Sequence, residues 1–89
     1  MRILILPKTE TAAPEKPKDY KFMEKSERVL ANIPAIWKQY PYTEEGLMSI
    51  VEMEYNELKA ATSTEQKKHE LVHLASACLY LWRRLSNVD

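Results

Sequence analysis

The sequence predicts an all-α fold in which two long helices form an antiparallel hairpin. Apolar residues recur at helical spacing in the segments 44–61 and 64–85, and a helix-capping residue precedes each segment. Because a connection of only two or three residues joins these segments, the two helices are expected to pack antiparallel to one another. The single glycine among 89 residues also disfavours β folds with many turns.

The chain is expected to divide into an N-terminal arm with a proline-rich linker, residues 1–18, and a helical domain, residues 19–89. The arm contains the apolar run 3–6, which is too short for a signal peptide or a membrane span and predicts at most a lone β-strand that needs a partner. Residues 8–18 have the polar, proline-rich composition of a solvated linker.

Each predicted helix has a start signal. Asp19 is the expected N-cap of a first helix that ends before Pro34. Thr43 is the expected N-cap of the second helix, and Ser63 with Gln66 forms the expected capping box of the third. The apolar stripe of the first helix consists of Phe22, Met23, Ser26, Val29, Leu30 and Ile33.

The composition limits the function classes. Thirteen basic and thirteen acidic residues cancel, so no basic excess indicates a nucleic-acid partner. Cys78 is the only cysteine, which excludes an internal disulfide and favours a reducing cytoplasm. There is no Walker or Rossmann glycine motif. A chain of this length buries only about 60–65% of its unfolded surface, so a second copy would stabilise it.

Two carboxylates interrupt the apolar stripe of the second helix. At about 100° per residue, Glu54 and Glu57 fall on or beside the arc that should face the core. Unpaired carboxylates are costly to bury, so these two need a cation, a proton or a metal. The apolar members of this arc are Leu47, Ile50, Leu58 and Ala61.

The third helix supplies complementary ligands. Glu70 lies at the margin of its apolar stripe and His73 lies one step further round, whereas His69 points away. Across the hairpin, Glu54, Glu57, Glu70 and His73 can converge into a hard-cation site suited to Mg²⁺ or Mn²⁺. The stripe is centred on Leu74, Cys78, Leu81 and Leu85, with Leu71 and Ala77 beside them.

Three other interpretations stay open. The carboxylates can simply edge the core and pair with Lys67, Lys68 or Arg84. The letters H-E-L-V-H, from His69 to His73, match the zinc-peptidase helix signature, although such a site also needs a third protein ligand and a sheet edge. Glu-x-x-His with a Glu on the neighbouring helix is also half of a ferritin-like dinuclear site.

Glu54-Tyr55-Asn56-Glu57 is followed, after 12 residues, by Glu70-Leu71-Val72-His73. This arrangement resembles the E-x-x-E and E-x-x-D motifs of the MazG-like all-α nucleoside triphosphate pyrophosphohydrolases and the related phosphoribosyl-ATP pyrophosphatase. The flanking segments "IVEMEYNELKAA" and "HELVHLASACLYLWRRL" are similar to the two motif helices of that family, so the resemblance covers about half the chain. In two departures, His73 stands in place of the final Asp, and Met53 stands in place of a preceding Glu.

The resemblance implies a divalent-metal-dependent hydrolase that converts a nucleoside triphosphate into the monophosphate and pyrophosphate. It implies that Glu57 and Glu70 are the catalytic carboxylates, and that Lys67 and Arg84 contact phosphates. Because one ligand is an imidazole, Mn²⁺ is expected to be preferred over Mg²⁺. The implied metal ligands are Glu54, Glu57, Glu70 and His73.

Self-association is also expected, because the last helix carries a second apolar flank that one short partner helix cannot cover. A homodimer or higher homo-oligomer with a four-helix core would bury this flank, which consists of Val72, Ala75, Leu79 and Trp82. Four aromatic residues can stack on a nucleotide base or pack in the core or the dimer: Trp37, Tyr40, Tyr42 and Trp82. The alternative function is a non-catalytic helical binding or regulatory protein on the same scaffold.

Overall fold

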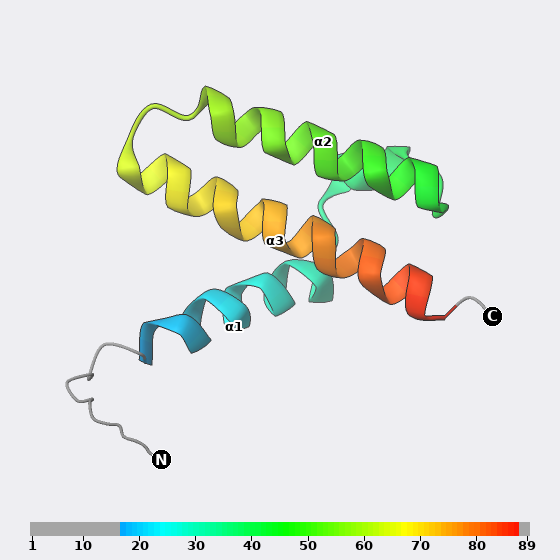
Figure 1. Ribbon diagram of the computed structural model, residues 1–89, viewed down its shortest axis with the longest axis horizontal. Coiled ribbons are helices and arrows are strands. Elements are labelled where there is room, and N and C mark those ends of the chain that lie inside the picture. The colour runs from blue at the N-terminus through cyan, green and yellow to red at the C-terminus, as the bar shows by residue number, and fades with distance from the viewer. Residues whose placement is uncertain (1–16, 88–89) are drawn as a thin grey trace, which may run out of the picture.

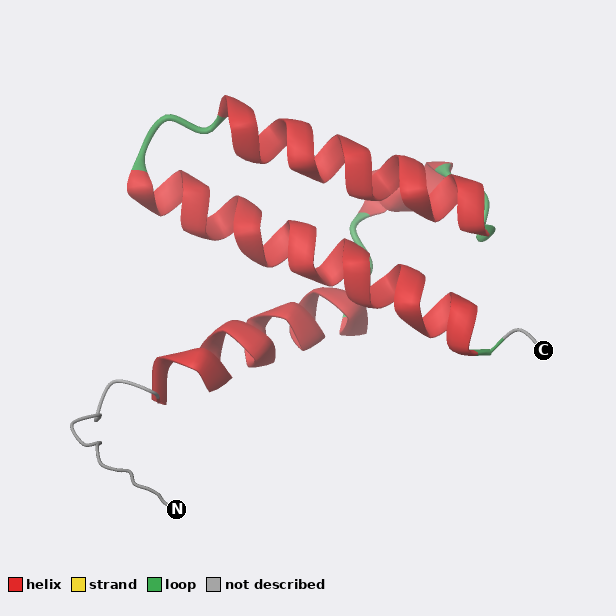
Figure 2. Cartoon of the chain, in the orientation of Figure 1, coloured by secondary structure: helices red, strands yellow, loops and turns green. Residues whose placement is uncertain are grey.

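The computed structural model describes residues 17–87, which form three α-helices and one short 3₁₀ helix (Figure 1). In chain order the elements are α1 (Pro17–Ala31), η3 (Ala35–Gln39), α2 (Glu44–Ala60) and α3 (Thr64–Ser86). Residues 17–87 contain no strand, which confirms the all-α prediction for this part of the chain (Figure 2). The predicted strand at 3–6 and the linker up to residue 16 lie outside the described residues.

The capping predictions for the two long helices are confirmed. The Thr43 side chain accepts a hydrogen bond from the Gly46 backbone N–H at 3.1 Å, at the start of α2. At the start of α3, the Ser63 hydroxyl accepts from the Gln66 backbone N–H, while the Gln66 side chain accepts from the Ser63 backbone N–H. These bonds satisfy N–H groups that the first turn of a helix leaves without partners.

The prediction for the start of the first helix is wrong by three residues. Helix α1 begins at Pro17, inside the segment expected to be linker, so Asp19 lies in the first turn and is not the N-cap. Proline favours this position because the first helical N–H has no intrahelical acceptor and the fixed φ of proline suits a helix. An acidic residue in the first turn still complements the helix dipole.

Helix α3 is the central element of the described structure. It lies side by side with α2 on one flank and contacts α1 on another (Figure 1). The fully buried hydrophobic core is small and lies where η3, α2 and α3 meet; its members are Trp37, Leu47, Ile50 and Ala77. Among residues 17–87, none of the helices combines the length and apolarity needed to cross a membrane.

Trp37 is the largest residue of this core and is only 1% exposed. Its ring stacks on Tyr80 of α3, with the ring centroids 5.7 Å apart, and Tyr80 in turn contacts Tyr42 at 5.4 Å. Burial raises the pKa of Tyr80, and the neighbouring Tyr42 raises it further. Of the two roles predicted for Trp37, base stacking or packing, the structure therefore supports packing.

The buried face of α3 differs from the predicted stripe. Ser76 and Ala77 are buried, whereas Cys78, Leu71 and Leu85 are exposed. The reason is that α3 is covered on two flanks by α2 and α1, so the small residues between those flanks become the most buried.

Helix α1 docks on α3 through small and charged groups. The Ser76 hydroxyl lies 3.1 Å from the backbone oxygen of Ser26 in α1 and 2.6 Å from that of Val72 in α3. This one buried hydroxyl group can therefore donate its hydrogen bond to either helix. At the edge of this contact, the Arg83 guanidinium donates to the Glu27 carboxylate at 2.7 Å. Part of the predicted α1 stripe is not covered, since Phe22 and Met23 are exposed.

The single glycine of the chain marks a close approach of backbone to helix. A Cβ atom on Gly46 would lie 2.1 Å from the backbone oxygen of Pro41 and 2.9 Å from its Cγ. Such distances are too short for non-bonded atoms, so the turn before α2 can fold over the first helical turn only because residue 46 has no side chain.

Candidate metal centre

The four predicted metal ligands line one pocket between α2 and α3. Glu54 and Glu57 come from α2, and Glu70 and His73 come from α3. The pocket has a volume of about 250 Å³, and the remaining wall residues are Pro34, Ile36 and Met53. Helical periodicity places these side chains on facing surfaces. Among the described residues, however, no group of three ligand atoms within 4.8 Å of one another includes Glu54 or Glu57.

Glu54 is the buried member of this group, with 7% of its surface exposed. The indole Nε1–H of Trp37 donates a hydrogen bond to its Oε2 at 2.8 Å. This bond explains how an apolar face tolerates a carboxylate, because a charge-assisted hydrogen bond offsets part of the desolvation cost. The partner is thus a core tryptophan, and not one of the basic residues considered from the sequence. The bond also fixes the carboxylate orientation and leaves Oε1 for another ligand.

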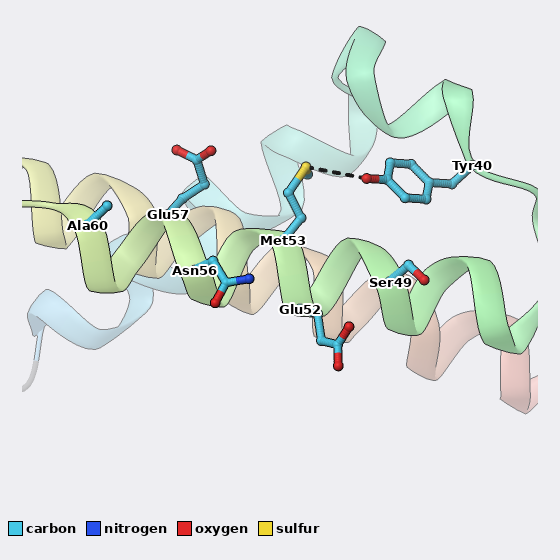
Figure 3. Close-up of a pocket in the computed structure, with 7 residues that line it drawn as sticks. All are labelled: Tyr40, Ser49, Glu52, Met53, Asn56, Glu57 and Ala60. Carbon is cyan, nitrogen blue, oxygen red and sulfur yellow. Dashed lines mark hydrogen bonds between the residues drawn. The ribbon is translucent and has the colours of Figure 1, made fainter.

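Glu57 lies one turn further along α2 and is exposed. Figure 3 shows its side chain on the same side of α2 as Met53, whereas Glu52 projects from the other side. The Tyr40 hydroxyl donates to the Met53 sulfur at 3.7 Å on that side. A second, larger hollow of about 440 Å³ adjoins this surface, and Glu57 lines both hollows. Glu57 is therefore the carboxylate that a dissolved ligand meets first.

Glu70 and His73 lie close together on α3 and are both partly buried. Their nearest atoms, His73 Nδ1 and Glu70 Oε1, are 3.7 Å apart. The ring of His69 lies edge-on to that of His73, with centroids 4.5 Å apart and an interplanar angle of 88°. One ligand atom from each of these three residues lies within 4.8 Å of the others. The sequence predicts that His69 points away from the apolar stripe, and in the structure its ring lies against that of His73, one helical turn away.

The two predicted phosphate contacts do not line this pocket. Arg84 lies eleven residues beyond His73, or about 16 Å along the helix axis. Its Nε donates to the Tyr42 backbone oxygen at 3.1 Å, and its guanidinium lies over the Tyr42 ring. Lys67 is exposed and lines neither the pocket nor the groove described next.

A basic groove lies on the other side of His73, between α1 and α3. Its volume is about 390 Å³, and Lys25 and Arg28 of α1 line it together with Lys68, His69 and His73 of α3 and one carboxylate, Glu65. The sequence did not reveal this groove because it depends on how α1 docks against α3, which no local pattern encodes. His73 is shared by the acidic pocket and the basic groove.

The donor types in the acidic pocket suit a divalent cation, although Glu54 and Glu57 would have to move closer to Glu70 and His73 to bind one ion together. Carboxylate oxygens are the ligands that Mg²⁺ and Mn²⁺ prefer, and an imidazole adds a nitrogen that Mn²⁺ accepts more readily. A pocket of about 250 Å³ also leaves room for water beside an ion. Comparison of the chain with protein-family models, with curated proteins and with solved structures gives no match.

Proposed function

We propose that this protein is a divalent-metal-dependent nucleotide pyrophosphohydrolase, which cleaves a nucleoside triphosphate into the monophosphate and pyrophosphate. The observation that carries the proposal is the convergence of Glu54, Glu57, Glu70 and His73 on one pocket. The same four positions carry the resemblance to MazG-like enzymes. Glu54 is buried and shares this pocket with two further carboxylates, a grouping that favours a cation over an additional unpaired charge.

The exposure of each carboxylate suggests a different role for it in the reaction. Glu54 is held by Trp37 and would be a fixed ligand, and Glu70 would be its counterpart on α3. Glu57 is exposed at the mouth, so it can orient a water molecule beside the bound phosphates and accept its proton. The ion, when bound, neutralises phosphate charge and lowers the pKa of the attacking water.

We also propose that α2 and α3 form an antiparallel hairpin that pairs with a second copy in a four-helix core. At about 100° per residue, one face of both helices points away from α1 and η3. Large apolar residues on that face are exposed, among them Met48, Tyr55, Leu71, Trp82 and Leu85. A patch of this composition is typical of a subunit interface.

The test is pyrophosphate release from the four ribonucleoside and four deoxyribonucleoside triphosphates, first with Mn²⁺ and then with Mg²⁺. Glu57→Gln and Glu70→Gln should each lower the rate by at least about 100-fold, because each removes a charged ligand. Glu52→Gln is the matched control, since Glu52 is an exposed carboxylate on the same helix that does not line the acidic pocket. Equal rates in all three variants and the wild type would refute the assignment.

His73 provides a second test of the same proposal. His73→Asp places a charged oxygen ligand where Mg²⁺ prefers one, so Mg²⁺-dependent pyrophosphate release should rise relative to Mn²⁺-dependent release. A Mg²⁺-to-Mn²⁺ rate ratio that stays at the wild-type value would show that residue 73 is not a ligand.

The second candidate is a non-catalytic helical binding protein. The Trp37–Glu54 hydrogen bond favours it, because this bond alone satisfies one oxygen of the buried carboxylate without any metal. Calorimetric titration with Mn²⁺ separates the two candidates. Binding of Mn²⁺ without pyrophosphate release would support the binding protein, and Mn²⁺-dependent release would support the hydrolase.

A further inference from the structure

We propose that His69, Glu70 and His73 form a binding site for a borderline transition metal such as Zn²⁺ on the surface of α3. The two imidazoles lie one helical turn apart, at i and i+4, so they project from the same side of the helix. Their rings are in edge contact at 4.5 Å, and a ligand atom from each of the three residues lies within 4.8 Å of the others.

The donor spacing is close to what a tetrahedral ion requires. With metal–ligand bonds of about 2.0–2.1 Å, adjacent donors around Zn²⁺ are about 3.3 Å apart. The His73 Nδ1 and Glu70 Oε1 atoms are already 3.7 Å apart. His69 is exposed and can change its rotamer, so the remaining adjustment does not require the helix backbone to move. Water can complete the coordination, because the groove beside these residues is open to solvent.

The surroundings select against hard cations at this site. Lys25, Arg28 and Lys68 line the same groove with a single carboxylate, Glu65, so the net charge of the groove is positive and opposes an ion that binds through charge alone. Neutral imidazole nitrogens bind Zn²⁺, Ni²⁺ or Cu²⁺ far better than they bind Mg²⁺. The site should therefore take a transition metal and leave Mg²⁺ in solution.

The new site shares two donors with the acidic pocket. Glu70 and His73 line that pocket, whereas His69 lines only the basic groove. An ion held by His69 would draw both shared side chains toward the groove and leave Glu54 and Glu57 as an incomplete site. Zn²⁺ should therefore antagonise Mn²⁺ at the acidic pocket; this antagonism, but not Zn²⁺ binding itself, rests on the proposed function.

Zn²⁺ titration of the full chain by calorimetry and by NMR of the histidine rings tests the proposal. The chain contains two histidines, so both ring signals should shift together as one Zn²⁺ binds per chain. His69→Ala should weaken Zn²⁺ binding by at least about 10-fold, because it removes one of three protein ligands. Lys68→Ala, next to it and equally exposed, should not weaken binding, and Glu54→Gln should leave it unchanged.

Unchanged Zn²⁺ affinity in His69→Ala would overturn the proposal, as would a Zn²⁺ site that Glu54→Gln also abolishes. Circular dichroism of each variant checks that the helices persist; if His69→Ala loses helix, His69→Gln replaces it and is judged by the same two outcomes. Loss of Zn²⁺ binding in His69→Ala without any pyrophosphate release by the wild type would support this site and reject the hydrolase. Pyrophosphate release with no coupled histidine shift would do the reverse.

Discussion

The side chains on the two faces of the α2–α3 pair have different surroundings. On the face covered by α1 and η3, buried polar groups have partners within the chain: Ser76 bonds to Ser26, and Glu54 bonds to Trp37. On the opposite face, large apolar side chains are exposed, and Trp82 is 63% accessible to solvent. The polar groups of one face are therefore satisfied within the chain, whereas the other face carries the exposed apolar surface on which we propose that a second copy packs.

The difference shows that the two faces of a short chain can be stabilised by different kinds of interaction. Specific hydrogen bonds between distant residues fix one arrangement of the covered face, because an unsatisfied buried donor or carboxylate is expensive. The uncovered face carries exposed apolar area. Burying this area against any complementary surface is favourable, because the hydrophobic effect is not directional. Substitutions on the two faces should therefore have different readouts, namely stability for one and molecular mass for the other.

The largest expected effect is on the covered face. Trp37→Ala removes the largest core side chain and the donor to Glu54, and should lower the free energy of unfolding by about 4–5 kcal/mol, measured by urea denaturation. Trp37→Phe keeps an aromatic ring but loses the N–H, so it should cost about 1–3 kcal/mol. If Trp37→Phe is as stable as the wild type, the Glu54 bond contributes nothing.

The uncovered face should respond through association. Trp82→Glu places a charge in the apolar patch and should raise the dimer dissociation constant by about 100-fold, which corresponds to nearly 3 kcal/mol at an interface anchor. Light scattering at micromolar concentration should then give the mass of one chain, with helix content by circular dichroism retained. Gln39→Glu, an exposed change on η3, is the matched control. A wild-type mass near one chain would reject the dimer itself.

A smaller effect is expected where the backbone meets α2. Alanine is a better helix former than glycine by about 1 kcal/mol, so an exposed glycine in a helix would be stabilised by the change. At Gly46 the new Cβ would collide with Pro41, so Gly46→Ala should instead destabilise the protein by about 1–2 kcal/mol. A thermal melting temperature above that of the wild type would show that the turn moves away without cost.

The smallest effect is expected at the exposed start of α3. Ser63→Ala removes the side-chain cap and half of the capping box, which should cost about 1 kcal/mol. Thr64→Ala, one residue later and without a capping bond, serves as the comparison. Equal urea midpoints for these two variants would mean that the capping box does not contribute to stability.

Features of this structure were predictable from the sequence where the interacting residues lie close together along the chain. The start of α2 at Glu44 and the start of α3 at Thr64 were predictable because the caps lie within three residues of the bonds they make. The start of α1 was missed because proline is common both in linkers and in the first turn of a helix, where Pro17 lies. The short helix η3 was missed because five residues are too few to show a period.

The candidate site divides in the same manner. Helical periodicity was enough to place Glu54 and Glu70 on facing surfaces of the two long helices. It could not reveal the tryptophan that binds Glu54, since seventeen residues and a turn separate the two. Nor could it reveal that Lys25 and His69 line the same groove, because the groove depends on how α1 docks against α3.

The three-residue connection between α2 and α3 sets the order in which we expect the chain to fold. Thr62 and Ser63 of this connection donate hydrogen bonds to the Gln66 side chain, so the two long helices meet after closing only a small loop. The contact of Ser26 with Ser76 spans fifty residues and should form later. Native-state hydrogen exchange should then show α1 opening at a lower free energy than α2 and α3, as a unit that detaches while the other two helices stay folded.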